Sequence, residues 1–181
     1  ISVTGVQTCA LPIYFRVAAI NSQGTGAYTS SASTTVLGVP DAPTGLSATA
    51  GNTQASLSWT APSNNGGAAV SDYSIQYSTD NTTWTSFSHT ASTTTSATIT
   101  GLTKNTLYYF RVAAINSQGT GAYTSSASTT VLGVPDAPTG ISSTSTAVSI
   151  TLTWTAPSNN GGSPITDYYF EYSTDNTNTI P

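Results

Sequence analysis

The sequence has few charged residues, a single cysteine and no methionine. Charged side chains make up 6% of its 181 residues, whereas about a quarter is usual in soluble domains. Only three residues are lysine or arginine and the formal net charge is −4. No basic patch is therefore present to hold phosphates, which excludes nucleic acid as a partner. No apolar run reaches the roughly 18 residues of a membrane-spanning helix, so we expect no membrane insertion of this stretch.

Serine, threonine, asparagine and glycine take the place of the missing charges. Low charge alone could indicate disorder, but disordered chains usually combine high net charge with few aromatic residues. Here 37% of the residues are hydrophobic and 9% are aromatic. Because these residues alternate with polar ones, the composition favours strands packed around a core.

One long stretch occurs twice without change. The sequence YFRVAAINSQGTGAYTSSASTTVLGVPDAPTG covers 14–45 and again 109–140, which gives an offset of 109 − 14 = 95 residues. This period is too long for a solenoid unit and suits a sandwich domain of about 100 residues. The chain therefore predicts a tandem array. One complete repeat covers 39–134, a truncated repeat over 14–38 holds the last two strands, and another over 135–181 holds the first three or four.

Residues 1–13 do not follow the repeat. They contain the only cysteine, Cys9, and the run from Val3 to Ile13 resembles the translation of a common sequencing-library adapter. We hypothesise that 1–13 is a non-native leader, to be excluded from fold reasoning. A natural leader is the alternative. Genomic sequence upstream of Tyr14 would decide, because a natural leader would be encoded there.

Seven short stretches of the complete repeat alternate apolar and polar residues, as strands with one buried side do. The sixth is the longest and is followed by the turn 116–121, whose glycines tolerate positive φ. The others lie at 46–48, 55–59, 73–77, 84–87, 95–100 and 123–131. No stretch has helical periodicity over a useful length. Seven strands at this spacing predict an all-β fold, a Greek-key immunoglobulin-like β-sandwich of two sheets.

Alternation on the sixth strand also predicts which residues face the core. Tyr108, Phe110, Val112 and Ala114 share one face, and Tyr109, Arg111 and Ala113 share the other. We expect the first face to be buried. Trp59 and Tyr73, on the second and third strands, are predicted to join Tyr108 in the core, with the indole ring as its anchor.

Together these residues resemble a fibronectin type III domain. The resemblance rests on the proline-rich start PDAP, on Trp59, Tyr73 and Tyr108, and on RVAAINSQGTG over 111–121, which matches the family's RVxAxNxxGxG. It implies that Tyr108 forms a tyrosine corner, whose hydroxyl group bonds to the backbone upstream. Lys104 departs from the family, which often has proline at that position.

The residues give no constellation for catalysis, metal binding or a cofactor. His89 is the only histidine and is expected to be a solvated loop residue. Asp41, Asp72 and Asp80 are too scattered for a calcium loop, which leaves turn capping as their role. Glu171 lacks the second carboxylate that glycoside hydrolysis needs. We therefore expect a non-catalytic chain without a cofactor or a metal site.

One surface is a candidate contact for a partner. Trp84, Tyr109, Arg111 and Ile115 are expected near one another on the outer face of the sheet, as an aromatic and arginine surface suited to a protein or a stacked sugar. The alternative is that they are scattered exposed residues of the ordinary kind. The turn 116–121 reads NSQGTG in place of the family's cell-attachment Arg-Gly-Asp, so integrin-type recognition is not implied.

The resemblance implies non-catalytic modules of an extracellular or cell-surface repeat protein. Such modules would act as a spacer and as a protein-binding or adhesion module, and the charge-poor surface and identical repeats favour this reading. The expected partners are an unknown protein or polysaccharide at the cell surface and the neighbouring repeats of the same chain. Two alternatives remain open, an accessory region of a secreted carbohydrate-active enzyme and direct sugar binding through Trp84 and Tyr109. The full-length gene would discriminate between them.

Overall fold

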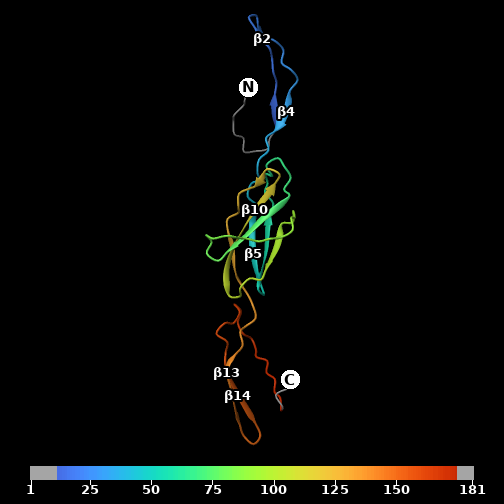
Figure 1. The fold of residues 1–181 in the computed structure, drawn as a ribbon. Coiled ribbons are helices and arrows are strands. Elements are labelled where there is room, and N and C mark those ends of the chain that lie inside the picture. The colour runs from blue at the N-terminus through green and yellow to red at the C-terminus, as the bar shows by residue number, and fades with distance from the viewer. Residues whose placement is uncertain (1–11, 175–181) are drawn as a thin grey trace.

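The computed structural model describes residues 12–174, so most of the suggested leader lies outside the described residues. This part of the chain contains strands and turns and no helix, and hence no helix long and apolar enough to cross a membrane. An N-terminal hairpin, a central sandwich and a C-terminal hairpin follow one another along the molecule, with the two hairpins at opposite tips (Figure 1).

The central sandwich has two sheets, in which all strand pairings are antiparallel. The first sheet has the order β5 (Thr44–Gly51), β6 (Gln54–Thr60), β9 (Ser96–Thr100). The second runs from β11 (Gly119–Thr120) through β10 (Thr106–Asn116) and β7 (Asp72–Ser78) to β8 (Thr85–Ser86), and β12 (Ala127–Val131) also pairs with β10. This arrangement confirms the predicted all-β, immunoglobulin-like fold class.

The core lies between these two sheets and is almost entirely apolar. Its residues alternate along β6, β7 and β10, because successive side chains of a strand point to opposite faces. The core cluster consists of Ala55, Leu57, Trp59, Tyr73, Ile75, Ile99, Leu102, Tyr108, Phe110, Val112, Ala114 and Val131. Trp59 meets Tyr73 edge-on, with 5.1 Å between the ring centroids. The backbone N–H of Thr103 donates to the Tyr108 hydroxyl group at 3.3 Å, which is the bond that a tyrosine corner requires.

Three local predictions need correction. The fourth strand is only Thr85–Ser86, and the seventh begins at Ala127, after the separate short strand β11. Ala113 is fully buried although it lies on the outer face of β10. It pairs with Ser74, whose hydroxyl group bonds the hydroxyl group of Tyr123 at 2.8 Å. The Tyr123 ring thus lies over this part of the face.

The N-terminal hairpin contains the last strands of a repeat. β1 (Pro12–Phe15) pairs with β4 (Ala32–Thr35), and β2 (Ile20–Asn21) pairs with β3 (Gly24–Thr25). The first of these strands begins two residues before the repeated sequence and therefore includes the end of the suggested leader.

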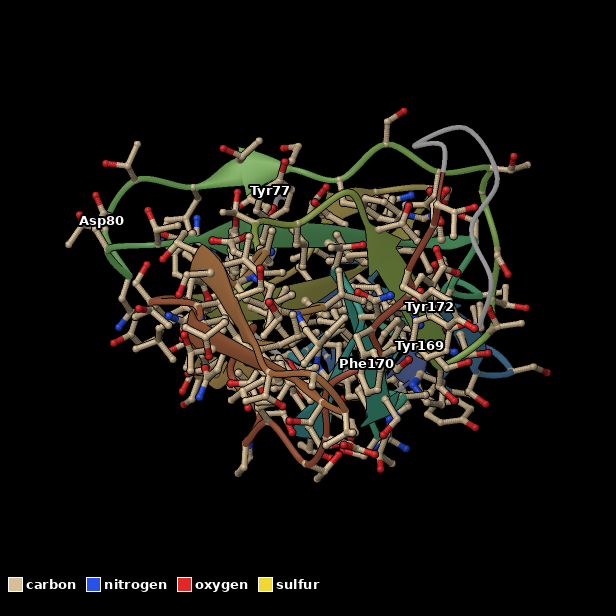
Figure 2. The ribbon with its side chains drawn as sticks, turned by 90° about the horizontal axis from the view of Figure 1, so that it is seen from below. Tyr77, Asp80, Tyr169, Phe170 and Tyr172 are labelled. Carbon is tan, nitrogen blue, oxygen red and sulfur yellow. The ribbon has the colours of Figure 1, made fainter. Side chains whose placement is uncertain are left out.

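The C-terminal hairpin pairs β13 (Thr139–Ser145) with β14 (Ile150–Thr155). These are the only strands among the described residues after 138, fewer than the three or four predicted. The segment 167–173, equivalent to β7, is not a strand, and within it only Tyr172 takes part in an isolated bridge. Its side chains Tyr169, Phe170 and Tyr172 are labelled in Figure 2 and are all more than half exposed.

Candidate functional site

The outer face of the second sheet carries an arginine held between two aromatic rings. Arg111 projects from β10, and its Cζ atom lies 4.1 Å from the centroid of the Trp84 ring and 4.3 Å from that of Tyr123. Its Nε and Nη2 groups both donate to Oε1 of Gln76, at 2.8 and 2.6 Å. Register explains this contact, because Arg111 and Gln76 are directly opposite on β10 and β7.

The structure brings together two of the four predicted contact residues. Trp84 and Arg111 touch, whereas Tyr109 and Ile115 are half-buried at other positions on β10, opposite Ser78 and Asp72. Sequence reasoning missed Gln76 and Tyr123. Gln76 could have been found only by pairing the third and sixth strands in register. That register depends on the lengths of the turns between the two strands.

This arrangement limits what the surface can bind. The guanidinium group covers one face of each ring, and such contacts are worth about 0.5–2 kcal/mol. A sugar could therefore stack only on the outer face of either ring. The guanidinium group has five N–H donors, and two are engaged here. The cluster is suited to polar recognition at its rim, as in a protein contact.

The cluster recurs in part in the other repeats. In the N-terminal hairpin Arg16, equivalent to Arg111, lies 4.2 Å from the centroid of the Tyr28 ring. The stack of arginine on tyrosine thus forms within the hairpin alone. In the third repeat Glu171 stands in place of Gln76, and a threonine outside the described residues stands in place of Trp84. The surface therefore changes its chemistry along the array.

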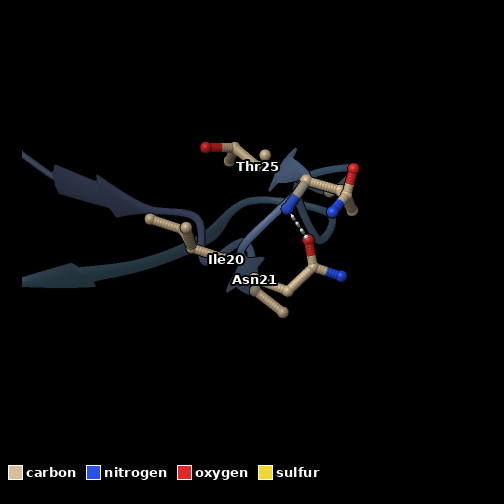
Figure 3. Close-up of a pocket in the computed structure, with 7 residues that line it drawn as sticks. Ile20, Asn21 and Thr25 are labelled. Atoms are coloured by element: carbon tan, nitrogen blue, oxygen red, sulfur yellow. Dashed lines mark hydrogen bonds between the residues drawn. The ribbon is translucent and has the colours of Figure 1, made fainter.

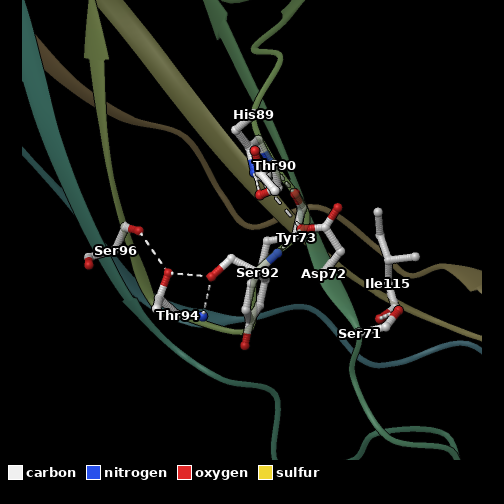
Figure 4. A network of polar contacts seen from close by, with 9 residues as sticks. All are labelled: Ser71, Asp72, Tyr73, His89, Thr90, Ser92, Thr94, Ser96 and Ile115. Carbon is white, nitrogen blue, oxygen red and sulfur yellow. Dashed lines mark hydrogen bonds and ion pairs between the residues drawn. The ribbon is translucent and has the colours of Figure 1, made fainter.

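His89 is an exposed loop residue, as predicted, and belongs to a second polar network, shown in Figure 4. Its Nε2 atom lies 2.9 Å from the carbonyl oxygen of Tyr73, and its Nδ1 atom lies 2.9 Å from that of Thr90. The Asp72 carboxylate is 3.9 Å from Nδ1 and accepts from the backbone of Ser92 at 3.0 Å. Carbonyl oxygens only accept hydrogen bonds, so the imidazole N–H is the donor in these contacts. These contacts hold the loop after β8 against β7.

Asp80 caps a turn. Oδ1 of Asp80 accepts from the backbone N–H groups of Thr83 and Thr82, at 2.7 and 2.8 Å, and from the Ser78 hydroxyl group at 2.8 Å. These donors, Thr83 first, hold the pKa of the Asp80 carboxyl group well below its usual range. Turn capping was the predicted role. Residues 12–174 contain no group of three or more histidine, cysteine or acidic side chains that could hold a metal ion.

A shallow hollow lies at the turn of the N-terminal hairpin, lined by residues 19–21 and 23–26 (Figure 3). Its one internal side-chain bond is from the backbone of Gln23 to Oδ1 of Asn21, at 2.9 Å. No charged side chain lines it. In the complete repeat the equivalent of Asn21 is Asn116, whose amide group has a structural role described below.

Comparison with known proteins adds three findings. The sequence model of the fibronectin type III domain matches residues 41–131. Titin from Drosophila melanogaster is 31% identical over 168 residues, which cover 87% of this chain and 1% of titin. Exoglucanase B from Cellulomonas fimi is 34% identical over 138 residues, which cover 71% of this chain and 12% of the exoglucanase. A crystal structure of titin domains is 25% identical with a TM-score of 0.49, covering 56% of this chain and 36% of that one. The chain thus spans only a small share of the relatives that it matches.

Proposed function

We propose a spacer and binding function for this chain, which belongs to the fibronectin type III domain family. In this proposal the chain is part of an extracellular or cell-surface repeat protein. The repeats hold a defined distance between other parts of that protein and contact a partner at the cell surface. Domains of this family are generally non-catalytic, and the observation that carries the spacer function is the way in which consecutive repeats are joined.

The same joint occurs twice, 95 residues apart. Each linker, 38–41 or 133–136, is hydrogen-bonded to a glycine-containing loop of the repeat that follows it, at 64–67 or 159–162. At the first joint, the backbone N–H groups of Gly38 and Asp41 donate to the carbonyl oxygens of Gly66 and Asn64, at 2.8 and 3.0 Å. At the second, Gly133 and Asp136 donate to Gly161 and Asn159 at the same two distances. Repetition of these bonds supports a joint that is built into every repeat.

The loop glycines are required by the closeness of this contact. Gly66 and Gly161 have φ values of 71° and 72°, in the left-handed region. A Cβ atom at Gly66 would overlap the carbonyl group of Gly38, and one at Gly161 would overlap that of Gly133. Only glycine lets the linker backbone approach so closely.

In the complete repeat, one side chain contacts the linker before it and another contacts the linker after it. The Asn116 side chain is buried and donates through Nδ2 to the carbonyl oxygens of Gly38 and Asn65, at 2.8 Å each. At the other joint Lys104 donates through Nζ to Asp136 Oδ1 at 2.6 Å and to the Val134 carbonyl oxygen at 2.8 Å. Such contacts restrict the angle between repeats, which is the property that a spacer needs.

A pair of glycine substitutions tests the spacer function. Gly161→Ala should clash with the linker and widen the distribution of end-to-end distances measured by small-angle scattering or by spin labels on the two hairpins. Gly101→Ala is the matched control, because Gly101 has a similar φ of 76° but open space around it. Equal widening in both variants would contradict the proposal, as would a wild-type chain that is already flexible.

The alternative function is an accessory region of a secreted carbohydrate-active enzyme. Its specific support is the identity of 34% to Exoglucanase B from Cellulomonas fimi. A hydrolase domain in the same gene would favour this alternative, and only further repeats with an anchor would favour the spacer. A binding assay on insoluble polysaccharides and a glycan array would test contact through Trp84 and Tyr109. Binding by the wild-type chain that is lost in Trp84→Ala would support a sugar contact, and no binding would remove it.

A further inference from the structure

The C-terminal hairpin already has the arrangement of the first two strands of the sandwich. Ser142 pairs with Thr153 in β13 and β14, as Ser47 pairs with Ser58 in β5 and β6, and both pairings show the same shift of register before them. The ring centroids of Trp154 and Tyr168 are 5.2 Å apart at 63°. Those of the equivalent Trp59 and Tyr73 are 5.1 Å apart at 68°. The C-terminal hairpin and Tyr168 therefore form one half of a sandwich core, which we call the half core.

This half core is uncovered among the described residues. An apolar groove runs along the hairpin and the segment that follows it, lined by Ile141, Leu152, Trp154, Tyr168 and Phe170. Phe170 is 63% exposed, whereas its equivalent in the sandwich, Ile75, is 2% exposed. In the sandwich it is β10 that covers this position, because Val112 lies directly opposite Ile75.

The N-terminal hairpin has the sequence that covers this face in the sandwich. Residues 14–37 are identical to 109–132, and their pairings are the same: Phe15 with Ala32 matches Phe110 with Ala127. Phe15 and Val17 are 40% and 68% exposed. Their equivalents Phe110 and Val112 are fully buried. The hairpin thus presents an unused apolar face in a preformed arrangement.

We propose that the N-terminal hairpin of one copy of this chain binds the C-terminal groove of a second copy. In this complex residues 14–20 pair with 167–173 as β10 pairs with β7, and 167–173 becomes a strand. The offset of 95 residues sets the register, with Val17 opposite Phe170 and Ala18 opposite Tyr169. The partner is a second copy because the two hairpins lie at opposite tips of one molecule (Figure 1).

Charge favours this pairing over contacts between like ends. The register places Arg16 opposite Glu171, where the sandwich has Arg111 opposite Gln76 with two hydrogen bonds to one amide oxygen. A carboxylate in place of the amide makes these bonds charge-assisted and therefore stronger. Two C-terminal grooves facing each other would instead bring acidic side chains together without a basic partner, because 167–173 contains Asp167 and Glu171 and no lysine or arginine.

The contact joins different surfaces, so it does not close on itself and extends a linear chain of molecules. The C-terminal hairpin and the segment 167–173 supply equivalents of β5, β6 and β7, and the N-terminal hairpin supplies equivalents of β10 and β12. Neither supplies an equivalent of β9. Since β9 pairs only with β6, at the edge of its sheet, its absence leaves the other pairings possible. The combined unit would sit between two complete repeats, as a repeat does within the array.

Charge reversal tests the proposal in sedimentation velocity experiments on the whole chain. The wild-type chain should form oligomers whose size rises with concentration, without a fixed stoichiometry. Arg16→Glu and Glu171→Arg should each weaken association about tenfold, because like charges then lie opposite each other. An equimolar mixture of the two variants should associate like wild type, since each interface regains opposite charges. The mixture is also the control for folding, because a misfolded variant would not recover.

Cross-linking tests the register independently. In a Cys9→Ser background, a chain with Ala18→Cys and a chain with Tyr169→Cys should form a mixed disulfide under mild oxidation. A wild-type chain that stays monomeric at every concentration would overturn the proposal. So would association unchanged in the single charge variants, or cross-linking of Tyr169→Cys chains only with one another.

Discussion

Replacing Trp59 by alanine gives the sharpest test of the core. The side chain is 6% exposed, and truncation of a large buried aromatic residue costs about 3–5 kcal/mol. One contribution has the opposite sign. The indole Nε1 atom is buried and has no hydrogen-bond partner among the described residues, and an unsatisfied buried donor costs about 1–3 kcal/mol. Because the alanine variant loses this penalty as well, we expect a net loss of about 3 kcal/mol, the low end of the range.

Urea denaturation followed by far-ultraviolet circular dichroism would measure this loss, and two variants calibrate it. Trp59→Phe removes the unsatisfied N–H group and keeps most of the apolar volume, so we expect a loss below about 1.5 kcal/mol. Trp154→Ala changes the equivalent residue in the C-terminal hairpin, which is 37% exposed, and should leave the main transition within about 0.5 kcal/mol. A loss under about 1 kcal/mol for Trp59→Ala would show that the indole ring does not anchor the core.

Three further predictions follow from single contacts. Tyr108→Phe should destabilise the sandwich by about 0.5–1.5 kcal/mol through the lost bond from Thr103, and an unchanged urea midpoint would show that this bond contributes nothing. Lys104→Ala should change the unfolding free energy by less than about 1 kcal/mol, because the ion pair of Lys104 with Asp136 is at the surface. The same substitution should speed amide hydrogen exchange in the linker 133–136. Unchanged exchange would contradict a role of Lys104 in the joint. Asp80→Ala should be less stable than wild type at neutral pH. Because folding lowers the pKa of Asp80, this difference should be full above about pH 4 and shrink as the pH falls further, and a difference independent of pH between 7 and 2 would refute this.

The fold class could be predicted because its signals are local. Alternation of apolar residues and the glycine-rich turns lie within single strands and loops, and the period of the repeat gave the size of the unit. Strand ends were less predictable. Trp84 and Phe87 both lie outside β8, although the backbone N–H of Phe87 still donates to the carbonyl oxygen of Ile75 in β7 at 2.9 Å. The residues themselves do not encode where such an edge strand ends.

The candidate site was only partly predictable for a related reason. Arg111 and Trp84 are conspicuous in a sequence with so few charges, but Gln76 is an ordinary polar residue until register places it opposite Arg111. The contacts of His89 were not foreseen, because its partners are the backbone carbonyl oxygens of Tyr73 and Thr90. Every residue has such an oxygen, so no pattern of side chains could reveal these contacts.

The sequence of the third strand occurs in two surroundings, and comparing them shows what the alternation of residues determines and what a neighbouring strand determines. DYSIQYS at 72–78 and DYYFEYS at 167–173 show the same alternation, and the second is the more apolar. Only the first is a strand, because β10 and β8 lie on either side of it. In the second, the ring of Tyr168 contacts that of Trp154, so this side-chain contact is present although 167–173 is not a strand. Alternation therefore encodes which face will be buried, whereas the backbone ladder needs a neighbouring strand, and in a repeat protein that neighbour can come from another molecule with the same sequence.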